Sequence, residues 1–552
     1  MRKLIAALAL LALSGCAALP TSIDVQTGPE LAVPGTQDFA YYSPAGPAVG
    51  ATAQEIVSGF LAAGTGPQND YAVAREFLSA GFAQRWQPVT KTLIRSGVPL
   101  FRESGQSVLL VEISLAATLD EHGRYQEAEQ PESEVLRFQL VREGGEWRID
   151  SAPNLTVVTQ PVFSVVFNAF PVYFADSRKT ILVPDLRWFP SRASTPTRLV
   201  NALLDGPSDW LAPSVTTAIP PETRLTINAV TVENGVALVD FNSNALAAGN
   251  LDRSIMLSQL RSTLIQISGI NEVALSVNDS IQEISGQTLT NISSNGPTYV
   301  LNRSGIQRLS AGERTGLSGT DQLVRNYDPT LFAITDDSGL IAFVSDTGVY
   351  LLRRDGISLQ LEQVSELTEV VALDFDNYGS LWVFPSDAAE PIQIVDSRGT
   401  TRNLTSNLTG TRISSVLSPE SNRLAQTIQD QSGQSAIAVQ TITRDASLLP
   451  LRVVDGYQLN TVIGQPISMT WNGANALRVL ELTVSGLSAL NEYPLTGPRR
   501  ALTMPPVVGK SILAGPSSIS TYLLSEDGQL WVLTGNTWRS NSTGVIALAA
   551  LR

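Results

Sequence analysis

The sequence predicts a multidomain protein in which two small α+β domains are followed by an all-β propeller of about six blades. The length of 552 residues exceeds the ~250–300 residues at which single cores stop growing. Residues 51–285 alternate between helical and strand periodicity, whereas short strands and turns repeat from Tyr299 onward. With 43% hydrophobic residues, the chain can fill several cores.

The propeller is predicted from a turn followed by an apolar strand, a pattern that recurs along residues 297–552. Consecutive anchors of this pattern are 34 to 53 residues apart, and they are Ile306, Leu340, Leu381, Leu424, Leu477 and Leu530. These gaps bracket the ~40–45 residues of a propeller blade. Six blades fit the segment best, five or seven are alternatives, and a pair of β-sandwiches is the alternative fold.

Residues 51–158 are predicted to form the first α+β domain. Ile56, Val57, Phe60 and Leu61 share one helical face, and Asn69-Asp70 is positioned to cap a second helix that continues to residue 78. Strands are predicted at 107–118, 134–141 and 145–150. Two helices followed by a curved antiparallel sheet resemble the NTF2-like cone.

Residues 165–285 are predicted to form the second α+β domain. A helix opens at Ser194-Thr195-Pro196 and stops at Asp205-Gly206-Pro207, because proline is tolerated in the first helical turn and glycine ends helices. A second helix is predicted at 251–267. Strands are predicted at 172–176, 182–188, 224–232, 236–241 and 272–277.

The N-terminus reads as a secretion signal over residues 1–15. Arg2 and Lys3 precede an apolar stretch from Leu4 to Leu13, which is too short to span a bilayer as a helix. Leu13-Ser14-Gly15-Cys16 resembles a bacterial lipobox, and this resemblance implies cleavage before Cys16, S-diacylglycerol on its thiol and an N-acyl group. Residues 16–50 then form a proline-rich tether. The alternative is an ordinary signal peptide with an incidental cysteine.

The composition excludes several kinds of chemistry. Cys16 is the only cysteine and His122 the only histidine, so no disulfide or Cys/His zinc site can form within the chain. A net charge of −14 argues against nucleic acid as a partner. We expect no metal or cofactor and no catalytic residue. His122 lies in a polar stretch that favours a surface loop.

Two groups of acidic residues are candidate sites. Residues 374–379 begin like a calcium loop, but Pro385 stands where the loop needs a glutamate, so a hairpin turn is favoured. Glu127 and Glu129, and then Glu132 and Glu134, are each spaced by two positions, as along one face of a strand, and could form a carboxylate pair. A solvated loop and strand edge is the favoured interpretation.

Several stretches resemble known families. The sequences LVNALLDGP, IPPETRL, VALVDFN and LRSTLIQISGINEVALSVND are similar to the GerMN module of bacterial sporulation and envelope proteins. Lipobox, tether, α+β domain, GerMN module and propeller, in this order, resemble the actinobacterial lipoprotein LpqB family over essentially the whole chain. One departure is the turn at 417–421, which carries no glycine.

The family resemblance implies a function. It implies a non-enzymatic accessory protein, lipid-anchored on the extracytoplasmic face of the cell membrane. Its implied partner is the extracellular sensor domain of a histidine kinase similar to MtrB, and its implied role is to regulate the MtrA–MtrB phosphorelay, cell-wall homeostasis and division. A peptidoglycan-binding envelope scaffold is the alternative, and a propeller enzyme that uses channel carboxylates is a third hypothesis.

Overall fold

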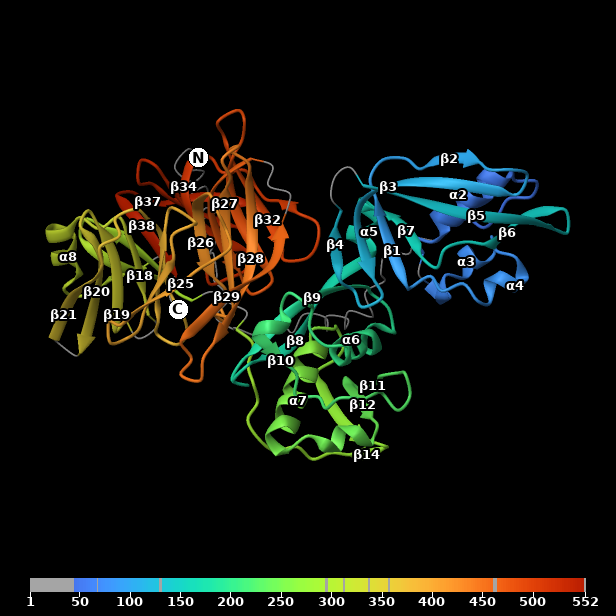
Figure 1. Ribbon diagram of the computed structural model, residues 1–552, viewed down its shortest axis with the longest axis horizontal. Coiled ribbons are helices and arrows are strands. Elements are labelled where there is room, and N and C mark those ends of the chain that lie inside the picture. Colours follow the sequence, from blue (N-terminus) through green and yellow to red (C-terminus); the bar gives the residue numbers. More distant parts are fainter. Residues whose placement is uncertain are drawn as a thin grey trace, which may run out of the picture. The chain divides into compact units, whose positions relative to one another are not determined.

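The computed structural model describes residues 44–66, 68–128, 132–292, 296–310, 313–335, 338–355, 358–459 and 464–550. The predicted signal peptide, Cys16 and most of the predicted tether therefore lie outside the described residues. Residues 43–552 form one compact unit. Figure 1 follows this unit through a first domain (blue), a second domain (green) and six further sheets (yellow to red).

The first domain packs five helical segments, of which α2 is the longest, against a seven-stranded sheet. The sheet has the order β6-β5-β3-β1-β7, and β2 and β4 also pair with β3. Ile56, Val57, Phe60 and Leu61 are buried, as predicted. The elements are α2 (Ala53–Ala63), η1 (Gln68–Asp70), α3 (Ala72–Arg75), α4 (Ala80–Ala83), β1 (Lys91–Arg95), β2 (Leu100–Glu103), β3 (Val108–Asp120), β4 (Tyr125–Glu127), β5 (Ser133–Glu143), β6 (Glu146–Ser151), β7 (Thr156–Thr159) and α5 (Gln160–Val166).

The second helix of this domain is shorter than predicted, and the predicted cap is wrong. Asn69, Asp70 and Tyr71 adopt φ angles of 47°, 55° and 59°, in the left-handed region that cannot continue a right-handed helix. Tyr71 precedes α3 without a side-chain cap. The Asp70 carboxylate instead accepts a hydrogen bond from Arg75 at 2.6 Å. Asp70, which was expected to cap the helix, therefore forms an ion pair with Arg75 instead.

The second domain combines two helices with two small sheets. Strand β12 pairs in parallel with β13, and α7 provides the crossover that a parallel pair needs. The elements are β8 (Phe167–Asp176), β9 (Leu182–Pro190), α6 (Thr195–Leu204), η2 (Ala212–Ser214), β10 (Val215–Thr216), β11 (Thr231–Glu233), β12 (Val236–Phe241), η3 (Ser243–Ala247), α7 (Asn250–Leu264), β13 (Glu272–Val277) and β14 (Ser280–Ile281).

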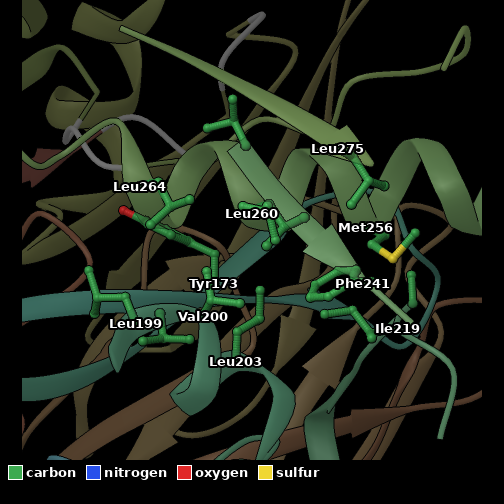
Figure 2. Packing of buried hydrophobic residues seen from close by; sticks show 14 of the residues in the cluster. Tyr173, Leu199, Val200, Leu203, Ile219, Phe241, Met256, Leu260, Leu264 and Leu275 are labelled. Atoms are coloured by element: carbon green, nitrogen blue, oxygen red, sulfur yellow. The ribbon is translucent and has the colours of Figure 1, made fainter. Parts of the chain in front are cut away.

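The core of the second domain lies between its helices and strands. Leu199 and Leu203 of α6 and Leu260 of α7 converge on Tyr173 and Phe241 (Figure 2), and all five are buried. Each fully buried Leu or Phe side chain contributes about 1.5–3 kcal/mol. The strand predicted at 224–232 is wrong for most of its length, because only its last two residues reach β11.

The C-terminal region forms six four-stranded sheets. Their strand orders are β17-β16-β15-β38, β18 to β21, β22 to β25, β26 to β29, β30 to β33 and β34 to β37. The elements are β15 (Thr298–Asn302), β16 (Gly305–Ser310), β17 (Glu313–Gly316), α8 (Thr320–Tyr327), β18 (Leu331–Ile334), β19 (Leu340–Ser345), β20 (Gly348–Asp355), β21 (Ser358–Ser365), β22 (Val370–Phe375), β23 (Leu381–Pro385), β24 (Ile392–Val395), β25 (Thr401–Leu404), β26 (Thr411–Leu417), β27 (Arg423–Gln429), β28 (Ser435–Arg444), β29 (Pro450–Leu459), β30 (Gln465–Asn472), β31 (Ala476–Leu482), β32 (Ser488–Pro494), β33 (Arg500–Ala501), β34 (Gly509–Ala514), β35 (Ser520–Ser525), β36 (Leu530–Thr534), β37 (Thr537–Ser542) and β38 (Val545–Ala550).

These sheets close into a ring, which confirms the predicted propeller and its six blades. The inner strands β18, β22, β26, β30, β34 and β38 contact one another in turn, and β38 contacts β18 to complete the circle. The last strand, β38, pairs with β15 from the start of the propeller and so closes the ring between chain ends. Closure leaves no blade without a neighbour on either face.

The six anchor residues of the sequence pattern occupy two different positions within the blades. Leu340, Leu381, Leu424 and Leu477 lie at the start of the second strand of their blades, whereas Ile306 and Leu530 lie at the start of the third. Successive hairpins of a blade use the same turn residues, so the sequence pattern could not distinguish them. In the described part of the chain, no helix is long and apolar enough to cross a membrane.

Candidate functional site

Strand β9 lies at the meeting point of the three domains. All nine of its residues are buried, although β9 has a strand partner, β8, along only one edge. An unpaired strand edge leaves backbone donors and acceptors that must be satisfied elsewhere. In β9 these groups are satisfied by segments from outside its own sheet, and those contacts form the candidate site.

The first domain binds the outer edge of β9 through a hairpin turn. The backbone N–H of Trp188 donates to the carbonyl of Gly123 at 2.8 Å. Gly123 has φ of +78°, and a Cβ there would clash with the Phe189 ring and the Trp188 carbonyl. The tight approach of the turn to β9 therefore requires glycine at this position.

The propeller binds the same edge through Thr496, in the segment that follows β32. The indole Nε1 of Trp188 donates to the carbonyl of Thr496 at 2.6 Å, and the Thr496 hydroxyl donates to the carbonyl of Leu186 at 3.1 Å. Arg423 of β27 donates to the carbonyl of Pro184 at 3.5 Å. Proline suits this edge because it has no N–H that would need a partner.

A buried ion pair supports β9 from within the second domain. Arg187 and Asp185 are 0% and 1% exposed, and their charged atoms lie 2.8 Å apart. Ser208 donates from its backbone and hydroxyl to the Asp185 carboxylate, at 2.6 and 3.0 Å. Arg187 also donates to the carbonyls of His122 and Gly206. Such neighbours supply the additional hydrogen bonds that a buried pair needs.

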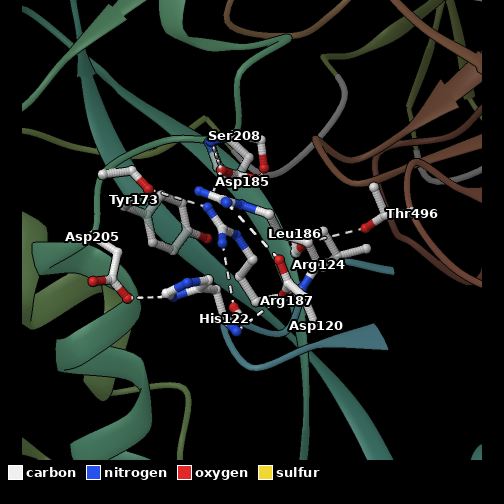
Figure 3. Close-up of polar contacts among 12 residues, drawn as sticks. Asp120, His122, Arg124, Tyr173, Asp185, Leu186, Arg187, Asp205, Ser208 and Thr496 are labelled. Carbon is white, nitrogen blue, oxygen red and sulfur yellow. Dashed lines mark hydrogen bonds and ion pairs between the residues drawn. The ribbon is translucent and has the colours of Figure 1, made fainter. Parts of the chain in front are cut away.

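His122 connects the first and second domains. As predicted, it lies in a turn, between β3 and β4. Its Nδ1 atom lies 2.6 Å from a carboxylate oxygen of Asp205, the residue that ends α6 (Figure 3), and its side chain is 32% exposed. His122 therefore lies in the predicted turn and is partly exposed, and its imidazole also contacts the second domain.

The turn at 417–421 brings a second buried ion pair to the junction. Glu420 and Arg423 are both fully buried and 2.5 Å apart. The Arg423 guanidinium also lies 4.9 Å from the centroid of the Trp471 ring. Ser421 takes the positive φ, +61°, that glycine commonly provides in such turns. The missing glycine is therefore offset by an ion pair that fixes the turn.

Glu127 also lies near the junction rather than at a solvated edge. Burial, together with the negative charge of the nearby Glu127 carboxylate, raises the pKa of Tyr457 in β29 to about 12. Tyr457 also packs near the Trp210 ring of the second domain, with centroids 6.5 Å apart. Glu134 is paired with Lys91 at 2.8 Å, and Glu129 lies outside the described residues.

The propeller channel is a cavity of about 160 Å³ between the inner strands. Among its described lining residues, Asp374 has the only carboxylate, and that carboxylate accepts the backbone N–H of Leu417 at 3.1 Å. Glycoside hydrolysis in most families uses two carboxylates. The described channel therefore does not present the pair that the enzymatic hypothesis requires.

The calcium-like segment forms a hairpin turn, as predicted. The Asp376 carboxylate accepts hydrogen bonds from the backbone of Tyr378 and Ser380 and from the indole of Trp382. Arg444 also binds it at 2.8 Å. The described residues contain no group of three or more His, Cys, Asp or Glu arranged to hold a metal. Cys16 lies outside the described residues.

The sequence reasoning missed the junction because its residues are far apart in the chain. One local signal was present: the apolar run from Leu182 to Pro190 contains Asp185 and Arg187, two residues apart and therefore on one face of the strand. A charged pair inside a buried strand indicates contact with polar groups of another segment. The partners of that pair could not be identified from spacing.

Comparison with known families assigns the first two domains. The family model for the N-terminal domain of lipoprotein LpqB matches residues 46–164, and the model described as sporulation and spore germination matches residues 171–283. These matches, followed by a six-bladed propeller, define a class of multidomain bacterial lipoproteins with a GerMN module. These domain matches and the relatives described below support the assignment of the chain to the LpqB family.

Relatives named Lipoprotein LpqB come from several actinobacteria. The Bifidobacterium longum protein is 28% identical over 71% of this chain and 69% of its own length. The Thermobifida fusca protein is 28% identical over 68% of this chain and 65% of its own length. The Streptomyces avermitilis protein is 24% identical, over 96% of this chain and 94% of its own length.

Two solved structures resemble parts of the chain. TolB from Acinetobacter baumannii is 15% identical and covers 47% of this chain and 66% of its own, with a TM-score of 0.36. The first GerMN domain of GerM from Bacillus subtilis is 21% identical and covers 22% of this chain and 92% of its own, with a TM-score of 0.19. Because both scores are low, the description of the fold rests on the strand pairing given above.

Proposed function

We propose that the protein is a non-enzymatic regulator, anchored through Cys16 on the extracytoplasmic face of the cell membrane, that binds the sensor domain of a histidine kinase similar to MtrB. The observation that carries this proposal is the three-domain junction on β9. Its bonds connect Gly123, Pro184, Leu186, Trp188 and Thr496 across all three domains.

The junction supports a binding role because it joins the domains through buried, directional contacts. Buried hydrogen bonds and ion pairs cost free energy when broken, so such contacts resist domain rearrangement. A partner that contacts two domains at once gains affinity when those domains are held in place beforehand. The LpqB family membership supports the envelope setting.

Co-purification from membranes tests this proposal. The full-length lipidated protein is expressed with a histidine kinase sensor domain of the MtrB type, and detergent extracts are captured on the lipoprotein. The control is residues 1–50 fused to an unrelated folded domain, which keeps the predicted anchor and tether. Enrichment of the sensor domain over this control is expected, and equal recovery from both would contradict the proposal.

A cell-wall scaffold remains the second candidate, because the predicted location would bring the protein close to peptidoglycan. Sedimentation with purified peptidoglycan distinguishes the two functions. A kinase regulator should stay in the supernatant, whereas a scaffold should sediment with the glycan. Sedimentation without enrichment of the sensor domain would replace the regulatory proposal with the scaffold.

A further inference from the structure

A polar cavity of about 390 Å³ lies between the first and second domains, beside the segment that connects β9 to α6. Its lining comes from the turn before α3 and from the segment that leads into α6. The lining residues are Asn69, Asp70, Ser191, Arg192, Ala193, Ser194 and Arg198. A volume of this size accommodates a small organic ligand.

Two guanidinium groups share this cavity. Arg192 and Arg198 are both half-buried, and Arg192 lies 5.5 Å from the centroid of the Tyr71 ring, which orients it. Burial, together with the nearby positive charge of Arg192, lowers the pKa of Arg198 to about 10. At neutral pH both groups stay charged and repel each other, so an anion between them would stabilise this arrangement.

The carboxylate in the cavity wall is already engaged by a third arginine. Among the described lining residues, Asp70 has the only carboxylate. The Arg75 guanidinium donates to that carboxylate at 2.6 Å and to the backbone carbonyl of Asp70 at 2.9 Å. Three arginines and one aspartate leave a local charge of about +2 in a chain whose net charge is −14. The cavity is therefore a positive region in an acidic protein.

The beginning of α6 adds to the positive character of the wall. The helix has ten residues, no acidic residue in its first turn and no side-chain hydrogen bond from its N-cap residue, Ser194. A helix N-terminus carries a partial positive charge that favours anions. This contribution has the same sign as the two guanidinium groups.

We propose that this cavity binds the phosphate group of a small, sugar-like phosphate monoester. A guanidinium presents a planar set of hydrogen-bond donors that matches phosphate oxygens. Two guanidinium groups therefore suit a dianionic phosphate ligand better than a ligand with one carboxylate. The hydroxyls of Ser191 and Ser194 and the amide of Asn69 suit a polyol attached to that phosphate. This proposal does not depend on the kinase proposal.

Calorimetric titration of the full-length chain tests the site, with inorganic phosphate, glucose 6-phosphate and glucose as separate probes. We expect phosphate to bind, glucose 6-phosphate to bind more tightly and glucose not to bind. Binding of phosphate alone, with no gain from the sugar, would overturn the assignment of a sugar-like ligand. No heat from either phosphate compound would overturn the site.

Three variants locate the binding. Arg198→Gln should weaken glucose 6-phosphate binding at least about tenfold, because it removes charge-assisted hydrogen bonds. Arg198→Lys keeps the charge without the planar fork and should fall between Arg198→Gln and the parent. Arg224→Gln is the control, because Arg224 is exposed in the same domain and paired with Glu222. An equal loss in Arg198→Gln and Arg224→Gln would overturn the assignment to this cavity.

Thermal unfolding separates binding from a structural effect. Without phosphate, Arg198→Gln should unfold at the parent temperature or above it, because one of two repelling charges is gone. With glucose 6-phosphate, the parent should unfold at a higher temperature and the variant should not, because a ligand that binds only the folded state stabilises it. A large fall in unfolding temperature without ligand would assign Arg198 a structural role and overturn the proposal.

Discussion

Trp188 and Thr496 lie 308 residues apart in the chain and are joined by a hydrogen bond at the edge of β9, where Thr496 also bonds to Leu186. The indole of Trp188 donates to the Thr496 carbonyl at 2.6 Å, and the Thr496 hydroxyl donates to the carbonyl of Leu186, two residues before Trp188. This pair of bonds joins the propeller segment after β32 to the second domain. The junction is therefore a specific, directional interface.

Trp188→Phe should loosen the attachment of the propeller to the second domain. The change leaves the buried Thr496 carbonyl without its indole donor, which costs about 1–3 kcal/mol. We expect faster proteolytic cleavage between residues 285 and 297, measured by limited digestion and mass spectrometry. Trp147→Phe, at a half-buried tryptophan of the first domain, is the control and should leave that cleavage rate unchanged.

Gly123→Ala should destabilise the contact between the first domain and β9. Alanine at a positive φ costs about 1 kcal/mol, and overlap with the Phe189 ring and the Trp188 carbonyl adds about 1–3 kcal/mol. Gly105→Ala is a matched control, because Gly105 has φ of +88° and open space around its Cβ position. Equal losses of thermal stability in the two variants would contradict a role for close packing.

Arg423→Met should destabilise the propeller strongly. The substitution leaves Glu420 buried without its cation, and breaking a buried ion pair in this way costs about 3–5 kcal/mol. The double variant Arg423→Met with Glu420→Gln should recover part of the loss in unfolding temperature. Arg398→Met, at an arginine whose side chain is 84% exposed in its ion pair, should cost no more than about 1 kcal/mol.

Asp445 should make part of the stability dependent on pH. A hydrogen bond from Arg402 and backbone donors from Ser447 and Leu449 lower the pKa of Asp445. Because the folded-state pKa lies below the unfolded value of about 3.9, this stabilisation is present above about pH 4 and is lost as the pH falls through the folded-state pKa.

The variant Asp445→Asn should therefore unfold at a lower temperature than the parent at pH 7, and the difference should shrink at pH 3. Lys510→Gln, at an exposed position in β34, serves as the control for a change of one charge. A difference between Asp445→Asn and the parent that stays constant from pH 7 to pH 3 would show that this carboxylate does not contribute through its ionised form.

Cys16→Ser should abolish the predicted lipid anchor. The serine hydroxyl cannot take the place of the thiol, so the protein should appear in the medium or remain as an uncleaved precursor. Phase partitioning in detergent and mass measurement of the N-terminus check this. A cleaved Cys16→Ser protein that still partitions with the detergent would refute the anchor.

The sequence by itself determined much of the local structure. The apolar periodicity of Ile56, Phe60 and Leu61 places α2 on its sheet, and the turn residues before Leu381 and Leu424 mark the propeller strands. These features could be predicted because helix and strand periods and turn chemistry act over a few residues. The spacing of the turn-and-strand pattern along the chain also predicts the six blades.

Only the tertiary structure decided which residues form the junction and the phosphate cavity. His122 and Asp205, and Arg192 and Asp70, come from different domains, and no local period relates their positions. The same limit explains the error at Asn69-Asp70, where an ion pair with Arg75 replaced the expected helix cap. Long-range contacts depend on how whole domains pack, and that packing is the sum of many weak interactions along the chain.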